Sequence, residues 1–243
     1  MLTTTPEMLS ENIIEINGLT KEFKHHTALD NITTCIKKGS IVGLLGPNGS
    51  GKTTLIKVLT GLLTHYHGEV KIDGATPGYE ANNFISYLPD KEHLPAWLSV
   101  NAAINFFRDF YEDFDTHKAR DMITSLNIPL TKKLKHLSRG QREKVQLALV
   151  MSRNARLYIL DEPIGAVDPA SRDLIVETIL KNINEGSSVL ISTHIISDIE
   201  PILDYALFIR DGKIFMQDDV ESIRENHAKS LDELFREVYK NVI

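Results

Sequence analysis

The chain has almost no cysteine and no long apolar stretch. Cys35 is the only cysteine in 243 residues, which excludes an internal disulfide and a cysteine-rich metal cluster and fits a reducing compartment. The longest apolar runs, such as those at 41–45 and 147–151, fall far short of the roughly 20 residues that a membrane-spanning helix needs. The first ten residues are polar and lack the charged start and apolar stretch of a signal peptide. We therefore expect a cytosolic chain with no membrane span of its own.

The chain also lacks an excess of positive charge, because its 33 acidic residues outnumber its 27 Lys and Arg residues. The formal net charge is −6 at pH 7, so the chain offers no general basic field for a nucleic-acid backbone, and we expect no nucleic-acid partner. The remaining composition, 42% hydrophobic and 25% charged, is ordinary for a folded globular protein. A chain of this length can bury a sizeable core in one large domain or two small ones.

Short apolar, β-prone runs recur along the chain, and several are separated by segments with helical periodicity. The runs lie at 13–16, 41–45, 84–88, 157–160, 188–192 and 205–209. Those at 157–160 and 189–191 are almost continuously apolar, as in strands that are covered on both faces. The pattern predicts an α/β fold with a mostly parallel sheet wrapped by helices.

Two further kinds of segment interrupt this pattern. The turn dipeptides Asp73-Gly74 and Asp211-Gly212 lie beside β-prone residues and predict short antiparallel excursions. Between about 89 and 151 the strand signal vanishes, which predicts a helical insertion in which Asp115 or Thr116 begins one helix and Ser138 another.

The chain becomes charged from residue 218 onward. Apolar residues then recur at the spacing of an amphipathic helix, at Leu231, Leu234, Phe235, Val238 and Tyr239. Two interpretations stay open here: the helix packs on its own domain, or it mediates self-association.

The segment at 46–53 satisfies the pattern G-x-x-x-x-G-K-[ST] in full. An apolar strand precedes it and a segment with helical spacing, 54–63, follows it. Glycines let successive backbone N–H groups point inward, and the helix adds its positive end, so the loop can hold a polyphosphate; a plain glycine-rich turn is the alternative. Lys52 can reach the outer phosphates and the Thr53 hydroxyl can ligate Mg²⁺. The expected nucleotide-binding residues are Gly46, Asn48, Gly49, Ser50, Gly51, Lys52, Thr53 and Thr54.

Two acidic residues end the apolar run at 157–160. Ligands lie at the carboxyl ends of parallel strands, so Asp161 is placed to hold Mg²⁺ and Glu162 to orient or deprotonate an attacking water. Without the phosphate loop, a solvated strand end would explain both acids equally well. His194 follows another strand and can donate to a γ-phosphate, although a single histidine at a strand end is usually structural.

Ser138 and Gln141 have the spacing of a capping box at a helix start. A helix N-terminus carries unpaired N–H groups and a partial positive charge, so it can bind phosphate. On its own this segment is an ordinary helix cap.

The order of these motifs resembles the ABC ATPase family. About 90 residues after the glycine loop the chain has Leu-Ser-Arg-Gly-Gln. It is followed by Leu-Asp-Glu-Pro, then by Val167-Asp168-Pro169 and His194. The resemblance covers about 13–216 and is strongest to the drug- and peptide-exporter branch, in which ATPase and membrane subunits are separate polypeptides. It implies a polar tail at 1–11, a nucleotide-binding domain at 12–216 with a helical subdomain at about 90–151, and a helical tail at 217–243.

The resemblance also implies the site and the partners. The fold would be a P-loop NTPase core with an antiparallel β subdomain. Two subunits would pair head to tail, with each ATP between one phosphate loop and the other subunit's signature helix, at Ser138, Gly140 and Gln141. Lys52, Glu162 and His194 would be catalytic, and Phe23 would stack on adenine, with core packing as its alternative role. The complex would drive an integral membrane subunit from the inner face of the cell membrane.

Three positions depart from the family's pattern. Asp90 stands where the family usually has the glutamine that touches Mg²⁺, and a carboxylate is a good ligand for that ion. We therefore expect Thr53, Asp161 and Asp90 as the metal ligands. Arg139 replaces the second signature glycine, and Ile164 follows Pro163 where a small hydroxyl residue is common. We expect slow but real hydrolysis.

Five aromatic residues follow Asp90, and a pair of histidines precedes the insertion. The aromatic residues form either the core of the helical insertion or a groove for a cytoplasmic helix of the membrane subunit; they are Trp97, Phe106, Phe107, Phe110 and Tyr111. His65 and His67 lack further ligands nearby, so we interpret them as part of a loop.

The leading hypothesis is therefore an export motor that binds and hydrolyses Mg-ATP. A soluble ABC ATPase acting on ribosomes or DNA is the alternative, but such proteins usually carry two nucleotide domains or long coiled-coil insertions. A small-molecule P-loop kinase would leave the Ser138 segment and His194 without a role.

Overall fold

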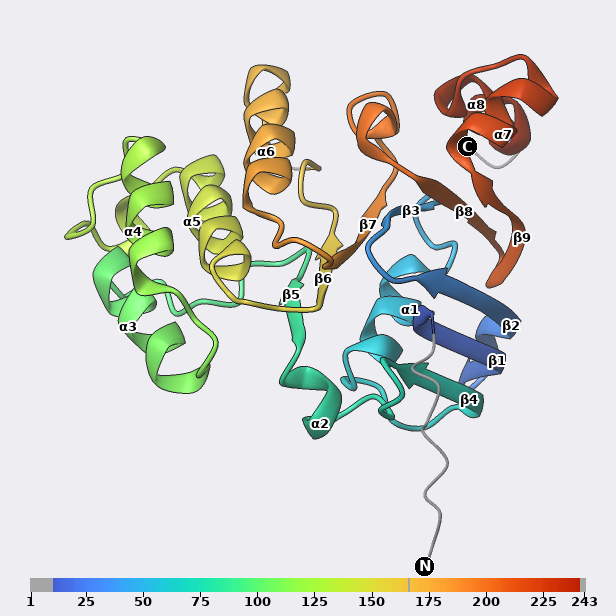
Figure 1. Cartoon of the computed structure of the whole chain (residues 1–243), viewed down its shortest axis with the longest axis horizontal. Helices are drawn as coiled ribbons and strands as arrows, with labels where there is room; N and C mark the ends of the chain where they lie inside the picture. Colours follow the sequence, from blue (N-terminus) through green and yellow to red (C-terminus); the bar gives the residue numbers. More distant parts are fainter. Residues whose placement is uncertain (1–10, 166, 241–243) are drawn as a thin grey trace, which may run out of the picture.

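The computed structural model describes residues 11–165 and 167–240. Its centre is a six-stranded sheet in the order β5-β6-β7-β3-β8-β9, parallel except at β9, which pairs antiparallel with β8 (Figure 1). The strands are β3 (Ile41–Leu45), β5 (Ile85–Leu88), β6 (Leu157–Asp161), β7 (Ser188–Thr193), β8 (Tyr205–Arg210) and β9 (Lys213–Asp219). Every residue of β6 and β7 is buried, because both faces of these central strands are covered. The predicted mostly parallel sheet is confirmed.

A smaller antiparallel sheet joins β1 (Asn12–Phe23), β2 (His26–Lys37) and β4 (His67–Ile72) in the order β2-β1-β4. The sequence predicted only its first few residues, at 13–16. In β2, buried and exposed residues alternate along most of the strand, but threonine, asparagine and aspartate interrupt its apolar pattern. The predicted loop at the two histidines is only partly right, since His67 begins β4.

Both turn dipeptides adopt left-handed backbone conformations. Asp211 (φ 49°) and Gly212 (φ 74°) connect β8 to β9 in the predicted antiparallel hairpin. Asp73 (φ 46°) and Gly74 (φ 82°) also form a turn, but only an isolated bridge between Ile72 and Ala75 closes it. The antiparallel excursion expected there is therefore short, and the preceding strand β4 pairs antiparallel with β1.

The helix after the phosphate loop is shorter than predicted. Helix α1 covers Lys52–Leu59 rather than 54–63, because Gly61 with φ 71° ends it. Leu62 lies beyond this end and is 62% exposed, so it is not part of the buried helical face. A short helix α2 (Tyr79–Asn82) follows before β5.

The segment between β5 and β6 is helical, as predicted. Helices α3 (Val100–Phe110), α4 (Thr116–Ser125) and α5 (Arg139–Met151), here called the helical group, are interrupted by a 3₁₀ turn, η1 (Leu134–His136). The Asp115 side chain accepts from the Lys118 N–H and caps α4, and Ser138 caps α5. The described part of this segment contains no strand, only single bridges. The exact subdomain boundaries stay predictions.

Arg153, just after α5, fastens the helical group to the central sheet. Its side chain is almost fully buried, donates to Asp113 at 2.9 Å and to the Asn83 carbonyl at 2.9 Å, and stacks on Tyr111 at 3.9 Å from the ring centre. A buried guanidinium is stable only when its donors are satisfied, so these contacts set how the two parts meet.

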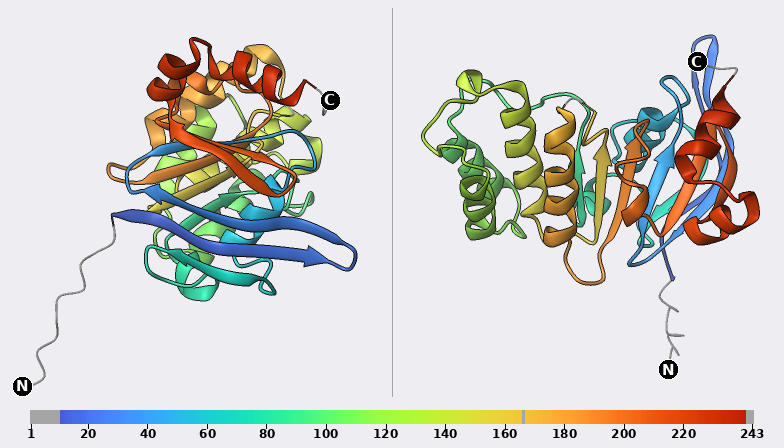
Figure 2. Two further views of the ribbon diagram at one scale, coloured as in Figure 1. Left: turned by 90° about the vertical axis from the view of Figure 1, so that its right-hand side faces the viewer. Right: turned by 90° about the horizontal axis from the view of Figure 1, so that it is seen from above.

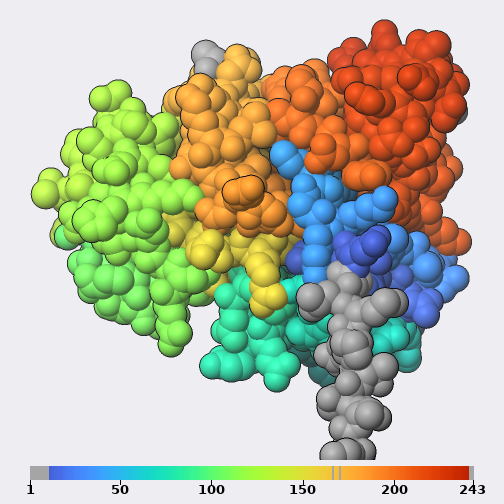
Figure 3. Space-filling model, in the orientation of Figure 1, coloured from blue at the N-terminus to red at the C-terminus, as the bar shows by residue number. Residues whose placement is uncertain are grey.

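The C-terminal helices pack on the same face of the central sheet as the helical group, because both contribute to one buried core. Helix α6 (Pro169–Asn182) precedes β7, and a second 3₁₀ turn, η2 (Glu200–Ile202), precedes β8. Helices α7 (Val220–His227) and α8 (Leu231–Tyr239) follow β9. Figures 1 and 2 show the helical group at one end of the molecule and α7 and α8 at the other, and α6 lies between them on the face in Figure 3.

The apolar face of α8 is buried against its own domain. Leu231, Leu234, Phe235 and Tyr239 are buried, and the Tyr239 hydroxyl donates to the Ile209 carbonyl at 2.8 Å. The first of the two interpretations of this helix is therefore confirmed. None of the helices within 11–165 and 167–240 combines the length and apolar character that crossing a bilayer requires.

Candidate nucleotide-binding site

The phosphate loop connects β3 to α1 and curls tightly against β8. Gly49 (φ 83°) and Gly51 (φ 113°) adopt left-handed conformations that favour glycine. At Gly46, an added Cβ would lie 2.5 Å from both the Ile209 carbonyl oxygen and the Ser50 Oγ, so only glycine fits there. The Leu55 N–H donates to the Gly51 carbonyl at 2.9 Å, and α1 thus begins directly at the loop. The strand, loop and helix predicted for this segment are confirmed.

The Lys52 ammonium lies in the centre of the loop. It donates to the Gly46 carbonyl at 2.6 Å and to the Pro47 carbonyl at 3.2 Å, and it is 3.5 Å from Glu162 Oε1. Burial lowers the pKa of Lys52, and the carboxylate of Glu162 opposes that effect. The two loop carbonyl oxygens accept hydrogen bonds from the Lys52 ammonium. Phosphate oxygens would accept the same hydrogen bonds when a polyphosphate binds.

Asp161, at the end of β6, has the features of a cation ligand. Only 1% of the residue is exposed; Oδ1 accepts from the Ser192 hydroxyl, whereas Oδ2 is buried and has no hydrogen-bond partner. Burial raises the pKa of this carboxyl, and the hydroxyls of Ser192 and Thr53 partly offset that effect. A buried carboxylate oxygen without a partner is costly unless a cation or proton satisfies it. The Asp161 and Thr53 oxygens therefore fit Mg²⁺, a cation that prefers oxygen ligands.

No group of three or more His, Cys, Asp or Glu side chains in the described ranges could hold a metal ion by itself.

Glu162 has a strained backbone that turns its side chain toward the loop. Its φ is 52°, uncommon for a residue with a Cβ, and its N–H donates to the Ser192 carbonyl at 3.0 Å. The two carboxylate oxygens then reach different partners: Oε1 is 3.5 Å from Lys52 Nζ, and Oε2 is 2.9 Å from His194 Nδ1. Glu162 therefore contacts both of the other residues that we expect to be catalytic.

These residues line a cavity of about 580 Å³, here called the loop cavity. The sequence-predicted residues on its wall are Phe23, Asn48, Gly49, Gly51, Lys52, Thr53, Thr54, Asp90, Glu162 and His194. Phe23 is 44% exposed, so core packing, its alternative role, is wrong. Gly46 and Ser50 are absent from the wall; Gly46 lies against β8, and Ser50 is buried.

Sequence reasoning missed part of this wall. His26 and Ala28, at the start of β2, and Gly165, after Glu162, also line the loop cavity. Their positions next to Phe23 and Glu162 were the only signal available. Arg139 lines it too, although the sequence marked this residue only as a departure from the family pattern.

Ser138, Gly140 and Gln141 at the start of α5 are not on the wall of the loop cavity of their own chain. The predicted capping box is confirmed: Ser138 Oγ accepts from the Gln141 N–H at 3.2 Å, and Gln141 Oε1 accepts from the Ser138 N–H at 3.1 Å. A Cβ added to Gly140 would meet nothing within 4 Å. This segment is accessible, and its role in nucleotide binding stays a prediction.

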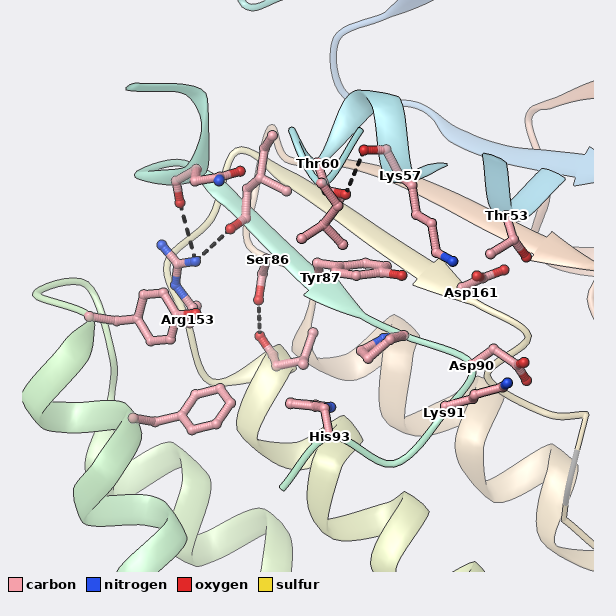
Figure 4. A pocket seen from close by; sticks show the side chains of 17 residues that line it. Thr53, Lys57, Thr60, Ser86, Tyr87, Asp90, Lys91, His93, Arg153 and Asp161 are labelled. Atoms are coloured by element: carbon pink, nitrogen blue, oxygen red, sulfur yellow. Dashed lines mark hydrogen bonds between the residues drawn. The ribbon is translucent and has the colours of Figure 1, made fainter. Parts of the chain in front are cut away.

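A second cavity of about 510 Å³, here called the side cavity, lies between α1, β5 and the helical group (Figure 4). Thr53 and Asp90 line both cavities. Figure 4 shows Thr53, Asp90 and Asp161 at one end and Arg153 at the other. Two of the residues that we expect to ligate Mg²⁺ thus also face the helical group.

The predicted aromatic cluster divides into two sets. Phe107 is buried in the helical group, and both Phe107 and Tyr111 line the side cavity. Trp97 and Phe110 are each 69% exposed and Phe106 is 44% exposed, so a role in the helical core is wrong for these three. The Phe106 and Phe110 rings contact each other at 4.5 Å between centroids.

A mostly parallel sheet, a glycine loop around a lysine after β3 and two acids at the end of β6 define a P-loop nucleotide-binding domain. A family model described as "ABC transporter" matches residues 29–165. A curated relative, the SkfA peptide export ATP-binding protein SkfE of Bacillus subtilis, is 32% identical over 92% of this chain and 96% of its own length. The ABC transporter ATP-binding protein YtrB of the same organism is 28% identical over 89% of this chain and 75% of its length.

Solved structures show the same fold. A structure titled as the ATP-binding subunit of an ABC transporter has a TM-score of 0.80 at 24% identity and covers 93% of this chain and 98% of that one. The cassette MJ0796 bound to ADP and Pi has a TM-score of 0.75 at 23% identity, covering 85% of this chain and 98% of that one. The chain belongs to the ABC transporter family and is an ATP-binding cassette ATPase.

Proposed function

We propose that this chain hydrolyses Mg-ATP as the motor subunit of an exporter, on the inner face of the cell membrane. The contact of Glu162 with both Lys52 and His194, beside the unpartnered Asp161 oxygen, is the observation that carries the proposal. In this arrangement the expected phosphate-binding cation and the base lie on the wall of the loop cavity, and the expected cation ligand, Asp161, lies on the wall of the adjoining side cavity.

Each residue then has a separate task. Lys52 exchanges its loop carbonyls for the outer phosphates, and Thr53, Asp161 and Asp90 supply oxygen ligands for Mg²⁺. The ion, when bound, neutralises charge that develops on the phosphates. Glu162 orients the attacking water and accepts its proton. With Nδ1 at Glu162, His194 presents its other nitrogen to the γ-phosphate.

The Glu162→Gln variant tests this assignment. The amide keeps the size of the side chain but cannot accept a proton, so we expect turnover to fall at least about a hundredfold, the lower range for loss of a general base. ATP binding, measured by calorimetry, should persist, and ATP-bound dimers should accumulate in sedimentation experiments. The control is Glu177→Gln, on exposed α6 and paired with Lys181. Unchanged turnover in Glu162→Gln would remove this residue from the mechanism.

A second ATPase subunit completes each site in this proposal. Ser138, Gly140 and Gln141 are at an accessible helix start and do not line the loop cavity of their own chain. They would instead contact the triphosphate bound by a partner subunit. Two positive helix ends around one γ-phosphate favour ATP over ADP, so ATP closes the dimer and hydrolysis opens it. Asp168, which caps α6, would lie in the loop that communicates between the subunits.

Export as the direction of transport rests on relatives. SkfE is described as a peptide export protein, and it is similar to this chain over nearly its whole length. The side cavity is suited to a cytoplasmic helix of the membrane subunit, because it combines the rings of Phe107 and Tyr111 with the charged Lys57 and Lys91. Its shared residues, Thr53 and Asp90, would connect such a helix to the nucleotide.

Leu62→Asp tests the docking position. Leu62 is exposed and lines the side cavity, so a carboxylate there should block an apolar helix surface without disturbing the fold. We expect basal ATPase activity to persist and copurification with the membrane subunit from native membranes to be lost. Leu180→Asp, at an exposed leucine on α6, is the matched control. Normal copurification of the Leu62 variant would contradict docking in the side cavity.

A further inference from the structure

The Ser192 side chain is buried beside the two acids at the end of β6. Ser192 lies on β7, directly opposite Asp161 in the parallel pairing of the two strands, and its exposed fraction is 0%. It contributes to the wall of neither the loop cavity nor the side cavity. Ser192 can therefore act on a bound ligand only through the residues that it contacts.

The Ser192 hydroxyl makes one hydrogen bond to each acid. Its Oγ donates to Asp161 Oδ1 and accepts from the Glu162 N–H at 3.1 Å. The Ser192 carbonyl accepts from the same N–H at 3.0 Å. A hydroxyl has a single proton, and a backbone N–H can only donate, so the proton of Oγ is directed at the carboxylate. Both hydrogen bonds of the hydroxyl thus have a fixed direction.

The bond to Oδ1 also determines where the second oxygen of Asp161 lies. A carboxylate is planar, so a contact that holds Oδ1 against β7 limits the rotation that would move Oδ2. Oδ2 is buried and has no hydrogen-bond partner, which leaves it available to ligate a cation. Contacts behind a metal ligand commonly fix its orientation in this way.

Glu162 is held by the end of β7 at two points. Its N–H is bound by Ser192, and its Oε2 lies 2.9 Å from Nδ1 of His194, two residues further along the chain. The backbone of Glu162 has a φ of 52°, a conformation that persists only where neighbouring contacts enforce it. The two acceptors of Ser192 are such contacts.

We propose that Ser192 positions the expected Mg²⁺ ligand Asp161 and the expected base Glu162 together. This rests on the proposed Mg-ATP hydrolysis and adds a positioning residue that touches neither the ion nor the nucleotide. The ends of β6 and β7 then act as one unit, because a shift of β7 moves Asp161, Glu162 and His194 at the same time.

The test measures metal binding to the ADP complex, which needs no turnover. Mn²⁺ is the probe, since it takes the same oxygen ligands as Mg²⁺, and its unbound fraction is measured by electron paramagnetic resonance. Ser192→Ala frees Oδ1, so we expect the ADP complex to bind Mn²⁺ at least about tenfold more weakly, the lower range for loss of a contact behind a metal ligand. Ser192→Cys keeps a weaker donor at the same position and should lie between the two. Calorimetric ADP affinity without metal should stay within about twofold in both variants, because the phosphate loop is unchanged.

The matched control is Ser188→Ala, at the other end of β7. Ser188 is also fully buried, and its Oγ accepts from the Gly39 N–H at 2.9 Å, so this variant loses a comparable hydrogen bond away from the acids. Thermal melts should show similar losses of stability in the two alanine variants, but Ser188→Ala should keep its Mn²⁺ affinity within about twofold.

Mn²⁺ affinity unchanged in Ser192→Ala would overturn the proposal, and so would an equal loss in Ser188→Ala. If the wild-type ADP complex binds Mn²⁺ no more tightly than ADP alone does, the proposed metal site itself falls, and the role of Ser192 falls with it. That outcome is distinct from a wild-type site that binds the ion and does not depend on Ser192.

Discussion

Gly46 and Glu162 occupy positions that few other side chains could take without strain. Gly46 is pressed against the Ile209 carbonyl, and Glu162 has the left-handed backbone that directs its carboxylate to Lys52 and His194. In both cases the backbone geometry, rather than the side chain alone, creates the site. Strain of this kind is maintained only where surrounding contacts enforce it.

Gly46→Ala should destabilise the protein and weaken ATP binding together. The new methyl group would overlap Ile209 and Ser50, and overpacking of this kind costs about 1–3 kcal/mol of unfolding free energy. Urea unfolding and calorimetric ATP titration measure the two effects. For comparison, Gly140→Ala adds the same methyl group where nothing lies within 4 Å, and it should raise helix stability by up to about 1 kcal/mol. Equal stability of the two variants would contradict this account.

Helices α7 and α8 depend on one buried carboxylate in η2. Glu200 accepts from the Arg224 guanidinium on α7 at 2.7 Å and from the Leu231 N–H at the start of α8 at 3.0 Å. One side chain therefore satisfies an arginine and an unpaired helix N–H at once. The contact explains why the C-terminal helices stay on the sheet instead of extending into solvent.

Glu200→Ala should loosen these two helices. Arg224 and the first N–H groups of α8 would lose their acceptor, at a cost of about 1–3 kcal/mol. Amide hydrogen exchange should accelerate in α8 while β6 and β7 stay protected. Lys229→Ala removes only an exposed pair with Glu237 and should change stability by less than about 1 kcal/mol. Slow exchange of α8 in Glu200→Ala would show that apolar packing alone holds the helix.

Across the whole molecule, Ser138, Gly140 and Gln141 lie outside the loop cavity, although Arg139 between them is on its wall. The phosphate loop belongs to the loop cavity, and Gly140 belongs to the Ser138 helix start. A head-to-tail dimer would bring the two surfaces together twice, by the same twofold symmetry. Each complete site would then contain parts of both chains.

Mixing two inactive variants tests this arrangement. Lys52→Ala removes the expected phosphate-binding cation, and Gly140→Asp places a negative charge at the helix start that would face the partner's phosphates. Each variant alone should be inactive. Their mixed dimers contain one site with both defects and one intact site, so random pairing should restore about a quarter of wild-type ATPase activity. A mixture that stays inactive would contradict the head-to-tail pairing.

Local sequence was sufficient for the features that depend on neighbouring residues. The glycine loop, the caps at Asp115 and Ser138, and the central strands are specified by residue type and spacing, so their predictions are confirmed. The family also followed from the order of motifs along the chain. Spacing placed Asp161 and Glu162 at a strand end beside the loop, because parallel strands align their carboxyl ends.

Contacts between distant segments decided the features of the fold and the site that the sequence did not predict. The pairing of β2 and β4 with β1, the exposure of Trp97 and the direct contact of Glu162 with His194 depend on how separate elements pack. Arg139 reached the loop cavity for the same reason. Burial and side-chain contact are set by neighbours far along the chain, and residue type or spacing carries no direct record of those neighbours.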